Sequence, residues 1–449
     1  MTRRISAVLT FLLLATLAGC GTPTVADPNG LDDPNATDPN AADPNAETWT
    51  VAPTGSTAHL LQPADLTYRG AFRLPGESGG STWAWGGYAM AYRPDGDPSG
   101  PADGCTGSLY GTGHAQQCYV SEISIPVPVI SAAKDVNELN VAETLQPFTD
   151  VRAGVGQLEV LQEIIRVGLA YLPRQGDQTA DKLYLAWGAH FQEDAQNVAS
   201  HMWCDTDLTN SHGAWRVGSY SLYSVNDYMF DIPQAWATAN VGGRLLATGR
   251  YRDGGWSGQG PALFAIAPWT QGNPPAHNTV LEATPLLLYS STFYEDPTDY
   301  KMVGYHNSDE WAGGAWLSAG DRSAVIFAGT KGTGNCWYGL TDGTVWPDEA
   351  PYPSDPNNER GWWSTSFVAR IIFFNPDDLA AVAAGTMQPR EPQPYAYLDL
   401  DDRLFHIQRA QQKDHLGAIA FDRDHGLLYV FEPFGDDEQP IVHVWAISG

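Results

Sequence analysis

The chain has 449 residues, of which 24 are Lys or Arg and 52 are Asp or Glu, so its formal charge is -28. A surface this acidic repels the phosphates of nucleic acids, which argues against DNA and RNA as partners. Apolar residues make up 43% of the chain, which also holds 46 Gly, 32 Pro, 16 Trp and 20 Tyr, and this composition favours an all-β globular domain rich in turns.

Residues 1–19 have the features of an export signal. Arg3 and Arg4 precede an apolar run at residues 7–15, which is too short to span a bilayer, and Leu17-Ala18-Gly19-Cys20 has the form of a bacterial lipoprotein cleavage box. We expect cleavage before Cys20, a lipid on its thiol and an acyl group on the freed amine, which together give stable anchoring. The alternative is a plain cleaved signal with an incidental cysteine. Cleavage of residues 1–19 would remove two arginines and no acidic residue, so the formal charge of the mature chain would change from -28 to about -30.

The predicted location is therefore the bacterial cell envelope, with the protein lipid-anchored and extracytoplasmic, so that one partner is the membrane. Gly21 follows Cys20 where inner-membrane lipoproteins of many Gram-negative bacteria carry Asp. The outer membrane is thus expected in a Gram-negative cell.

Residues 20–56 form a predicted tether that begins at the lipidated Cys20. The sequence Asp-Pro-Asn occurs four times here, at Asp27, Asp33, Asp38 and Asp43, and large apolar side chains are almost absent. Such a segment cannot bury a core, and its like charges keep it extended. Calcium binding is the alternative, but the glycine and the terminal Glu of an EF-hand loop are missing.

A unit recurs through residues 57–449, which we predict to be one domain. Short β-runs, most of them stopped by proline, recur at residues 122–126, 229–233, 263–268, 372–376 and 443–447. Two further strands precede most of them, at residues 87–92 and 109–111, 168–171 and 183–185, 314–317 and 325–327, and 417–422 and 428–430. Units of about 40–50 residues with four short strands are typical of a β-propeller.

The expected fold is thus an all-β propeller of five to seven blades, because two of the gaps between units could each hold an additional blade. The strand at residues 68–74 has no partner in its own unit, so we expect it to close the ring by joining the C-terminal blade. A β-sandwich is the alternative. One helix is predicted at residues 377–384, with Asn375 as its N-cap, Pro376 in the first turn and Gly385 as its stop.

Four cysteines remain after Cys20, and an even number outside the cell suggests two disulfides. The favoured pairs are Cys105 with Cys118, which flank a hairpin strand, and Cys204 with Cys336. Zinc binding is the alternative, but no C-x-x-C spacing supports it, so no metal site is predicted, and the sequence does not identify a cofactor.

Propellers bind ligands where equivalent loops converge at the mouth of the central channel. The residues that follow the second strand of each unit include His114, His190, Arg250, Lys331 and Glu432. Titratable groups at matched positions predict a site for an anionic or polyhydroxylated ligand. The alternative is that these side chains satisfy loop carbonyls or pair with neighbouring acids.

A glycine-rich loop at residues 250–260 is the second candidate for ligand contact. Trp256 and Asp253 could form a sugar platform there, or could equally be packed parts of a propeller loop. Asp253, Asp309, Glu310 and His190 are the candidate catalytic residues of a carbohydrate-active hydrolase or lyase. Asp309 and Glu310 are adjacent, so they should point to opposite faces and not act as one dyad.

Four segments, at residues 242–250, 260–265, 321–332 and 440–445, resemble a group of uncharacterised bacterial secreted or lipid-anchored proteins with propeller-like repeats. The resemblance spans about residues 66–447 and implies the same fold. That group has no known activity, so the resemblance implies no catalytic residue.

Three functions are compatible with these features. The first is a lipid-anchored propeller that binds a carbohydrate, an anionic ligand or an envelope protein at its mouth. The second is a hydrolase or lyase that uses carboxylates there, and the third is a scaffold for an envelope complex.

Overall fold

Five β-sheets of four or five strands make up the described part of the chain in a computed structural model. The structure describes residues 51–52, 57–98, 100, 105–155, 166–188, 198–220, 222–251, 253–290, 301–407 and 410–448, but not the side chains at positions 222, 223 and 253. The predicted signal, Cys20 and almost all of the predicted tether lie outside these residues.

Each sheet is one blade, numbered here in chain order. Blade 1 holds β2 (Met90–Arg93), β3 (Ser108–Thr112), β4 (Val120–Ser124) and β5 (Thr144–Thr149). Blade 2 holds β6 (Arg166–Leu172), β7 (Lys182–Gly188), β8 (His201–Asp205), β9 (His212–Val217) and the short parallel strand β13 (Val280–Leu281). Blade 3 holds β10 (Tyr228–Asp231), β11 (Leu246–Gly249), β12 (Leu263–Ile266) and β14 (Ala283–Leu287).

Blades 4 and 5 complete the set. Blade 4 holds β15 (Glu310–Ala319), β16 (Arg322–Gly339), β17 (Gly361–Phe374) and β18 (Ala396–Asp399). Blade 5 holds β19 (Ile419–Asp422), β20 (Leu427–Asp436), β21 (Gln439–Ile447) and, as its outermost strand, β1 (Leu66–Arg73).

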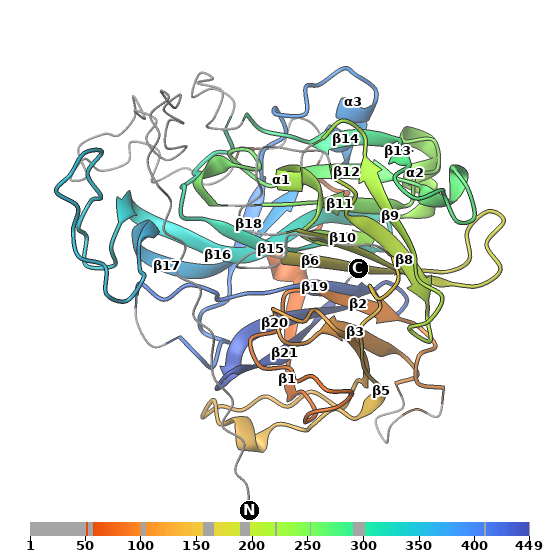
Figure 1. The fold of residues 1–449 in the computed structure, drawn as a ribbon, viewed down its shortest axis with the longest axis horizontal. Coiled ribbons are helices and arrows are strands. Elements are labelled where there is room, and N and C mark those ends of the chain that lie inside the picture. The colour runs from red at the N-terminus through yellow and green to blue at the C-terminus, as the bar shows by residue number, and fades with distance from the viewer. Residues whose placement is uncertain are drawn as a thin grey trace, which may run out of the picture. The chain divides into compact units, whose positions relative to one another are not determined.

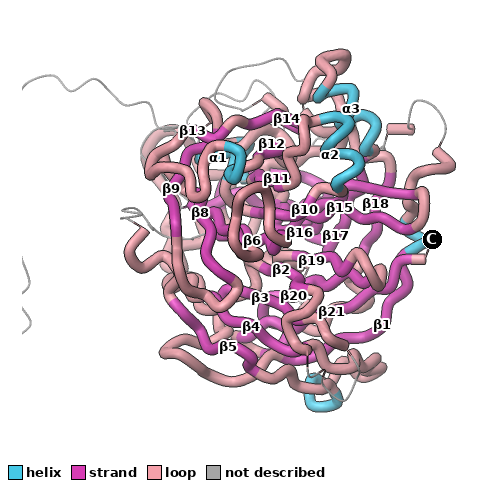
Figure 2. Tube along the Cα trace, turned by 90° about the vertical axis from the view of Figure 1, so that its right-hand side faces the viewer, coloured by secondary structure: helices cyan, strands magenta, loops and turns pink. Residues whose placement is uncertain are grey.

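The first strand of each blade lies at the centre of the ring. Each inner strand contacts the inner strand of the next blade, in the closed order β2, β6, β10, β15, β19 and back to β2, as Figure 1 shows. The other strands follow outward, for example β11, β12 and β14 beyond β10 (Figure 2). This closed order confirms the predicted all-β propeller and gives it five blades, the lower end of the expected range.

The N-terminal strand closes the ring as predicted. β1 pairs antiparallel with β21, from Leu66 opposite Ile447 to Arg73 opposite Ile441. The last blade therefore contains strands from both ends of the domain, and β1 covers the edge that β21 would otherwise expose.

One of the recurring β-runs, at residues 229–233, does not occupy the same strand position in its blade as the others. The runs at residues 122–126, 263–268, 372–376 and 443–447 fall on third strands, but residues 229–233 fall on β10, an inner strand. Proline ends a strand wherever it stands in a blade, so Pro233 does not mark the end of a unit. The two long gaps consequently hold one blade each.

Three short α-helices are described: α1 (Leu222–Val225), α2 (Gln234–Asn240) and α3 (Pro376–Ala383). The predicted helix is α3, and the side chain of Asn375 accepts a hydrogen bond from the backbone N–H of Asp377, as an N-cap should. Among the described residues, no helix has both the length and the apolar character needed to cross a membrane.

The central channel is narrow. Inner-strand residues of all five blades line a cavity of only about 10 Å³, and several of them are small, including Ala89, Gly168, Ala312, Gly314 and Ala418. Neighbouring blades also approach closely at Gly313, where an added Cβ would lie 2.8 Å from the carbonyl oxygen of Gly417. The centre of the ring is therefore filled by backbone and small side chains. Polar side chains that could contact a ligand are expected at the ends of the channel.

No disulfide links the four cysteines of the described residues, Cys105, Cys118, Cys204 and Cys336, so the predicted pairs are absent from the structure. Cys105 precedes one end of β3, whereas Cys118 precedes Val120, which pairs with Thr112 at the other end of that strand. A strand of this length keeps them farther apart than the ~7 Å that a disulfide can span. Cys204 and Cys336 lie in blades 2 and 4, which blade 3 separates.

Candidate functional site

Polar side chains from all five blades meet where the inner strands begin. The group, here called the mouth cluster, consists of one residue from each blade, which are, in order, Tyr88, Arg166, Asp227, Glu310 and Asp414. Each of them opens an inner strand or precedes it by a few residues. Because the inner strands run in the same direction around the ring, these positions converge at one end of the channel.

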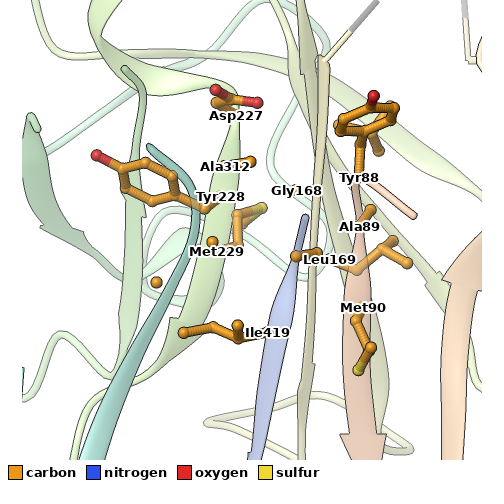
Figure 3. A pocket seen from close by; sticks show the side chains of 14 residues that line it. Tyr88, Ala89, Met90, Gly168, Leu169, Asp227, Tyr228, Met229, Ala312 and Ile419 are labelled. Carbon is orange, nitrogen blue, oxygen red and sulfur yellow. The ribbon is translucent and has the colours of Figure 1, made fainter. Parts of the chain in front are cut away.

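Two direct contacts join blades 1, 2 and 5 in this cluster. The hydroxyl of Tyr88 donates a hydrogen bond to Oδ1 of Asp414 at 3.1 Å, and the guanidinium of Arg166 lies 4.6 Å from the centre of the Tyr88 ring. Figure 3 shows the oxygens of Tyr88 and Asp227 at one end of the cavity, with Met90 and Ile419 toward the other. Burial and the Asp414 charge raise the pKa of Tyr88 well above its usual value, so its hydroxyl stays a donor.

Asp227 is the buried member of the cluster. It is 2% exposed, and its Oδ1 has no hydrogen-bond partner among the described residues. Burial raises the pKa of Asp227 to about 6, although Arg166, Arg250 and the backbone N–H of Tyr251 all lower it. A carboxyl group with this pKa can give up or accept a proton near neutral pH, which is a property of general acids and bases.

Arg166 supplies the positive charge at the centre of the cluster. Burial opposes that charge, but Asp227, Tyr88, Glu310 and Asp414 together hold the pKa of Arg166 above its usual value. Arg166 is therefore positively charged at any pH at which the protein is folded. It offsets part of the negative charge of the three carboxyl groups.

An exposed tryptophan lies at the edge of this end of the ring. Trp85 precedes Tyr88 by three residues and is 47% exposed. Its ring meets Phe434 edge-on at 5.5 Å, and its backbone N–H donates to the carbonyl of Glu438 in the hairpin between β20 and β21. The mouth cluster thus has a fixed aromatic surface beside it.

Three residues predicted from the second strands are buried in the protein interior. Nζ of Lys331 lies 2.6 Å from Oδ1 of Asp309, and both side chains are fully buried. Arg250 is buried and donates to Oδ1 of Asn226 at 3.1 Å. Burial lowers the pKa of Lys331 to about 8, against the opposing effect of Asp309.

Glu432, the third of these residues, is also buried. Its carboxylate accepts hydrogen bonds from the backbone N–H groups of Phe405 and His406, and its Oε2 lies 2.8 Å from Nε2 of His443. These bonds tie the chain before β19 to β20 and β21.

The remaining predicted residues have mixed placements. His114 is partly exposed, its backbone N–H donates to the carbonyl of Thr82, and its Nδ1 accepts from the backbone N–H of Gln116. Trp256 is partly buried in the loop after β11. Asp253 begins a 3-10 turn at Asp253–Gly255, but its side chain is not described, and His190 lies outside the described residues.

Asp309 and Glu310 have separate surroundings, as their adjacency predicts. Asp309 is held by Lys331 and by the backbone N–H groups of His306 and Gly332, whereas Glu310 contributes to the electrostatic environment of Arg166. Glu310 is therefore the member of this pair that belongs to the mouth cluster.

A chain of hydroxyl, imidazole and thiol groups lies behind the mouth in blade 4. Oγ of Ser364 is 3.1 Å from Nδ1 of His306 and 2.7 Å from Oγ of Ser308, and Sγ of Cys336 is 3.7 Å from that same Ser308 oxygen. Ser308 and Ser364 are fully buried. This network links the loop before β15 to the strands β16 and β17.

Sequence reasoning missed Tyr88, Arg166, Asp414 and Trp85. The available signal was a charged or phenolic residue just before each inner strand, as in Arg166-Val167-Gly168 and Asp227-Tyr228. Across the described residues, no group of three or more His, Cys, Asp or Glu side chains is arranged to hold a metal ion.

No protein-family model matches the chain, and no curated protein matches it. Among solved structures, it is similar to the β-propeller domain of Cps50 (Swd1) from Myceliophteria thermophila, with 11% identity and a TM-score of 0.26, over 85% of this chain and 100% of that chain. The strand pairing and the closed ring of inner strands define the five-bladed propeller independently of this similarity.

Proposed function

We propose that this protein is a lipid-anchored, extracytoplasmic β-propeller that binds a carbohydrate at the mouth cluster. The observation that carries the proposal is the convergence of five polar side chains, one from each blade, at one end of the channel. Binding sites in ring-shaped folds form where equivalent segments meet, and a few convergent polar groups beside apolar surface are typical of ligand sites.

The charge balance favours a neutral polyhydroxylated ligand over an anion. Three carboxyl groups, on Asp227, Glu310 and Asp414, outnumber the guanidinium groups of Arg166 and Arg250. Carboxylates accept hydrogen bonds from sugar hydroxyls and Arg166 can donate to them, while the exposed ring of Trp85 offers a flat apolar surface.

Calorimetric titration of the mature protein with neutral mono- and disaccharides and with uronic acids tests this proposal. We expect a neutral sugar to bind, and Tyr88→Phe and Asp414→Asn to weaken its binding about tenfold each, because Asp414→Asn removes a carboxylate acceptor and Tyr88→Phe removes the hydroxyl that donates to that carboxylate. Asp402→Asn is the matched control, since Asp402 is an exposed carboxylate outside the mouth cluster. Unchanged affinity in both mouth variants would overturn the proposal.

The proposed anchoring has its own test. Replacement of Cys20 by Ser removes the thiol that would carry the lipid. We expect the wild-type protein to incorporate labelled fatty acid and sediment with membranes, and the Cys20→Ser variant to do neither. Membrane association of the variant would contradict lipid anchoring.

A carbohydrate-active hydrolase or lyase is the second candidate, and the pKa of Asp227, about 6, favours it. In a hydrolase, Asp227 would protonate the leaving oxygen while Glu310 or Asp414 activates water or attacks the sugar. We expect sugar release to depend on pH with an inflection near 6, and Asp227→Asn to lose turnover while it keeps sugar binding. If glycans bind but no sugar is released from any of them, the hydrolase or lyase function is contradicted and only the binding function remains.

A scaffold role is favoured by one surface feature. Val127, Ile130 and Val141 are exposed apolar residues on the segment that lies against β1. Apolar patches of this kind are typical of protein interaction sites. Replacement of Val127 and Ile130 by Ser should then release a partner that is crosslinked to the wild-type protein in cells, and retention of that partner would argue against the role.

A further inference from the structure

Two strands of blade 4 extend beyond the rest of their sheet. β16 and β17 pair with each other as far as Gly339 opposite Gly361, whereas β15 pairs with β16 only up to Thr330, and β18 pairs with β17 only from Arg370. Residues 331–339 and 361–369 thus form a two-stranded extension about 30 Å long. Figure 1 shows it, with its connecting loop, running outward beyond β15 and β18.

The extension and its loop carry a connected row of rings, here called the aromatic arm and made up of Tyr338, Trp346, Tyr352, Arg360 and Trp362. Tyr338 and Trp362 are opposite each other in the register, with ring centres 5.3 Å apart. The guanidinium of Arg360 lies 5.9 Å from the Tyr338 ring and 4.9 Å from the Trp346 ring. Trp346 stacks on Tyr352 at 5.7 Å, and Tyr352 is 56% exposed.

The inner end of the arm lies beside the loops that lead to the mouth cluster. A Cβ added at Gly254 would lie 2.7 Å from Nε1 of Trp362, and the backbone N–H of Gly254 donates to the carbonyl of Asn307. Ser364 shares a strand face with Trp362 and contacts His306 and Ser308, just ahead of Glu310. These buried contacts connect the base of the arm to the loop that leads into Glu310 of the mouth cluster.

The loop of the arm is held in one conformation. The carboxylate of Asp355 accepts hydrogen bonds from the backbone N–H groups of Glu359 and Arg360, and Thr341 donates to Glu359. Nε1 of Trp363 donates to the carbonyl of Glu359. A surface already ordered before binding loses little conformational entropy on binding, so weak stacking contacts can add up.

The net negative charge of the arm and its loop favours neutral polymers over anionic ones. Residues 340–360 contain five carboxylates and only one basic residue, Arg360. This excess of negative charge repels anionic polymers. Aromatic faces flanked by carboxylate acceptors suit a neutral sugar chain, whose C–H faces pack on rings and whose hydroxyls donate hydrogen bonds.

We propose that the aromatic arm binds a neutral polysaccharide chain, one part of which occupies the mouth cluster. The inference rests on the proposed carbohydrate-binding function and adds to it the class of ligand, a polymer and not a single sugar. A chain long enough to reach both regions gains affinity from each of them, because the second contact is intramolecular once the first has formed.

Affinity measurements on the mature protein, with neutral oligosaccharides of increasing length and with the corresponding soluble polysaccharides, test the inference. We expect affinity to rise at least tenfold from the monosaccharide to the polymer. Trp346→Ala and Tyr352→Ala should each remove most of that gain and leave monosaccharide affinity unchanged. The matched control is Tyr397→Ala, because Tyr397 is also an exposed ring next to an arginine, on the outer strand β18.

The two proposals fail in different ways. Affinity that does not depend on chain length, or that is equal in the arm variants and the wild type, overturns the inference and leaves the mouth site standing. Polymer binding that is lost in the arm variants but unaffected by Tyr88→Phe and Asp414→Asn supports the arm and counts against the mouth. Binding of a proline-rich peptide instead of any glycan, lost in Tyr352→Ala, would also overturn the inference.

Discussion

Asp227 and Lys331 both place an ionisable group in the interior near the mouth. The two groups differ in whether a partner of opposite charge lies within hydrogen-bonding distance. Asp227 has an unpaired Oδ1 and a pKa of about 6, whereas Lys331 is paired with Asp309 at 2.6 Å and has a pKa of about 8. The unpaired Oδ1 of Asp227 remains available for a ligand, while a closed ion pair is satisfied within the protein. The consequences for stability differ accordingly.

Replacement of Asp227 by Asn should change the pH dependence of folding. The folded-state pKa is raised from 3.8 to about 6, so the folded protein binds more protons than the unfolded chain between these pH values. Wild-type stability relative to Asp227→Asn therefore falls by about 3 kcal/mol as the pH rises from below 4 to above 6. Urea denaturation of both proteins at several pH values measures this difference, and a constant difference would contradict the raised pKa.

Replacement of Lys331 by Met should leave the carboxylate of Asp309 buried without its cation. We expect a loss of about 3–5 kcal/mol in unfolding free energy, much of it recovered in the double variant Lys331→Met, Asp309→Asn. Arg403→Met is the matched control, because Arg403 and Asp402 form an exposed pair, for which about 0–1 kcal/mol is expected. Denaturation of the four proteins checks this, and a single variant no worse than the control would refute it.

Sequence reasoning could not show which of the polar residues at the second strands are covered by other parts of the protein. Arg250 directly follows β11, whereas Lys331 and Glu432 lie within β16 and β20, and all three are buried in contacts with their own or adjoining segments. Position along a strand does not reveal whether a neighbouring blade covers a side chain. Tyr88 could not be recognised either, since its partner Asp414 is 326 residues away.

At the scale of elements, β1 depends on a backbone conformation that only glycine adopts readily. Gly70 has a φ of +117° at the point where the pairing of β1 with β21 shifts its register, and an added Cβ would lie 2.5 Å from the backbone of Val129. The last blade can therefore be closed only if this position has no side chain.

Replacement of Gly70 by Ala tests this requirement. We expect a loss of about 2–4 kcal/mol, from the strained φ and from the displacement of the Val129 segment. Gly76→Ala is the matched control, since nothing lies within 4 Å of the Cβ it would add. Thermal and urea denaturation measure both variants, and equal stability would mean that β1 contributes little to ring closure.

Most strands could be predicted because apolar runs ended by proline or glycine are local signals. The run at residues 229–233 was assigned to the wrong place in its blade, since the order of strands depends on which partner each one finds. The extension of β16 and β17 was not foreseen for a related reason. Its two segments are rich in Gly and Trp and read as loops until the pairing of Tyr338 with Trp362 is known.

At the scale of the whole molecule, the five blades hold together without covalent crosslinks among the described residues. Cys118 and Cys204 are buried, and burial raises the pKa of both thiols, that of Cys118 to about 12. Thiols react as thiolates, so these groups should be inert in the folded protein.

A thiol titration of the non-reduced Cys20→Ser variant checks this arrangement. We expect Cys118 and Cys204 to react slowly before unfolding, and four thiols to react per chain after unfolding in urea. Two thiols or none in the unfolded chain would show that disulfides form in the exported protein.

The closure of blade 5 by β1 also determines when folding can finish. Leu66 pairs with Ile447, roughly 380 residues further along, which is nearly the full length of the domain. Contacts between such distant residues carry a large loop-closure entropy and form slowly. A chain that emerges N-terminus first must keep β1 unpaired until β21 follows it, so ring closure waits for the synthesis or export of the last residues.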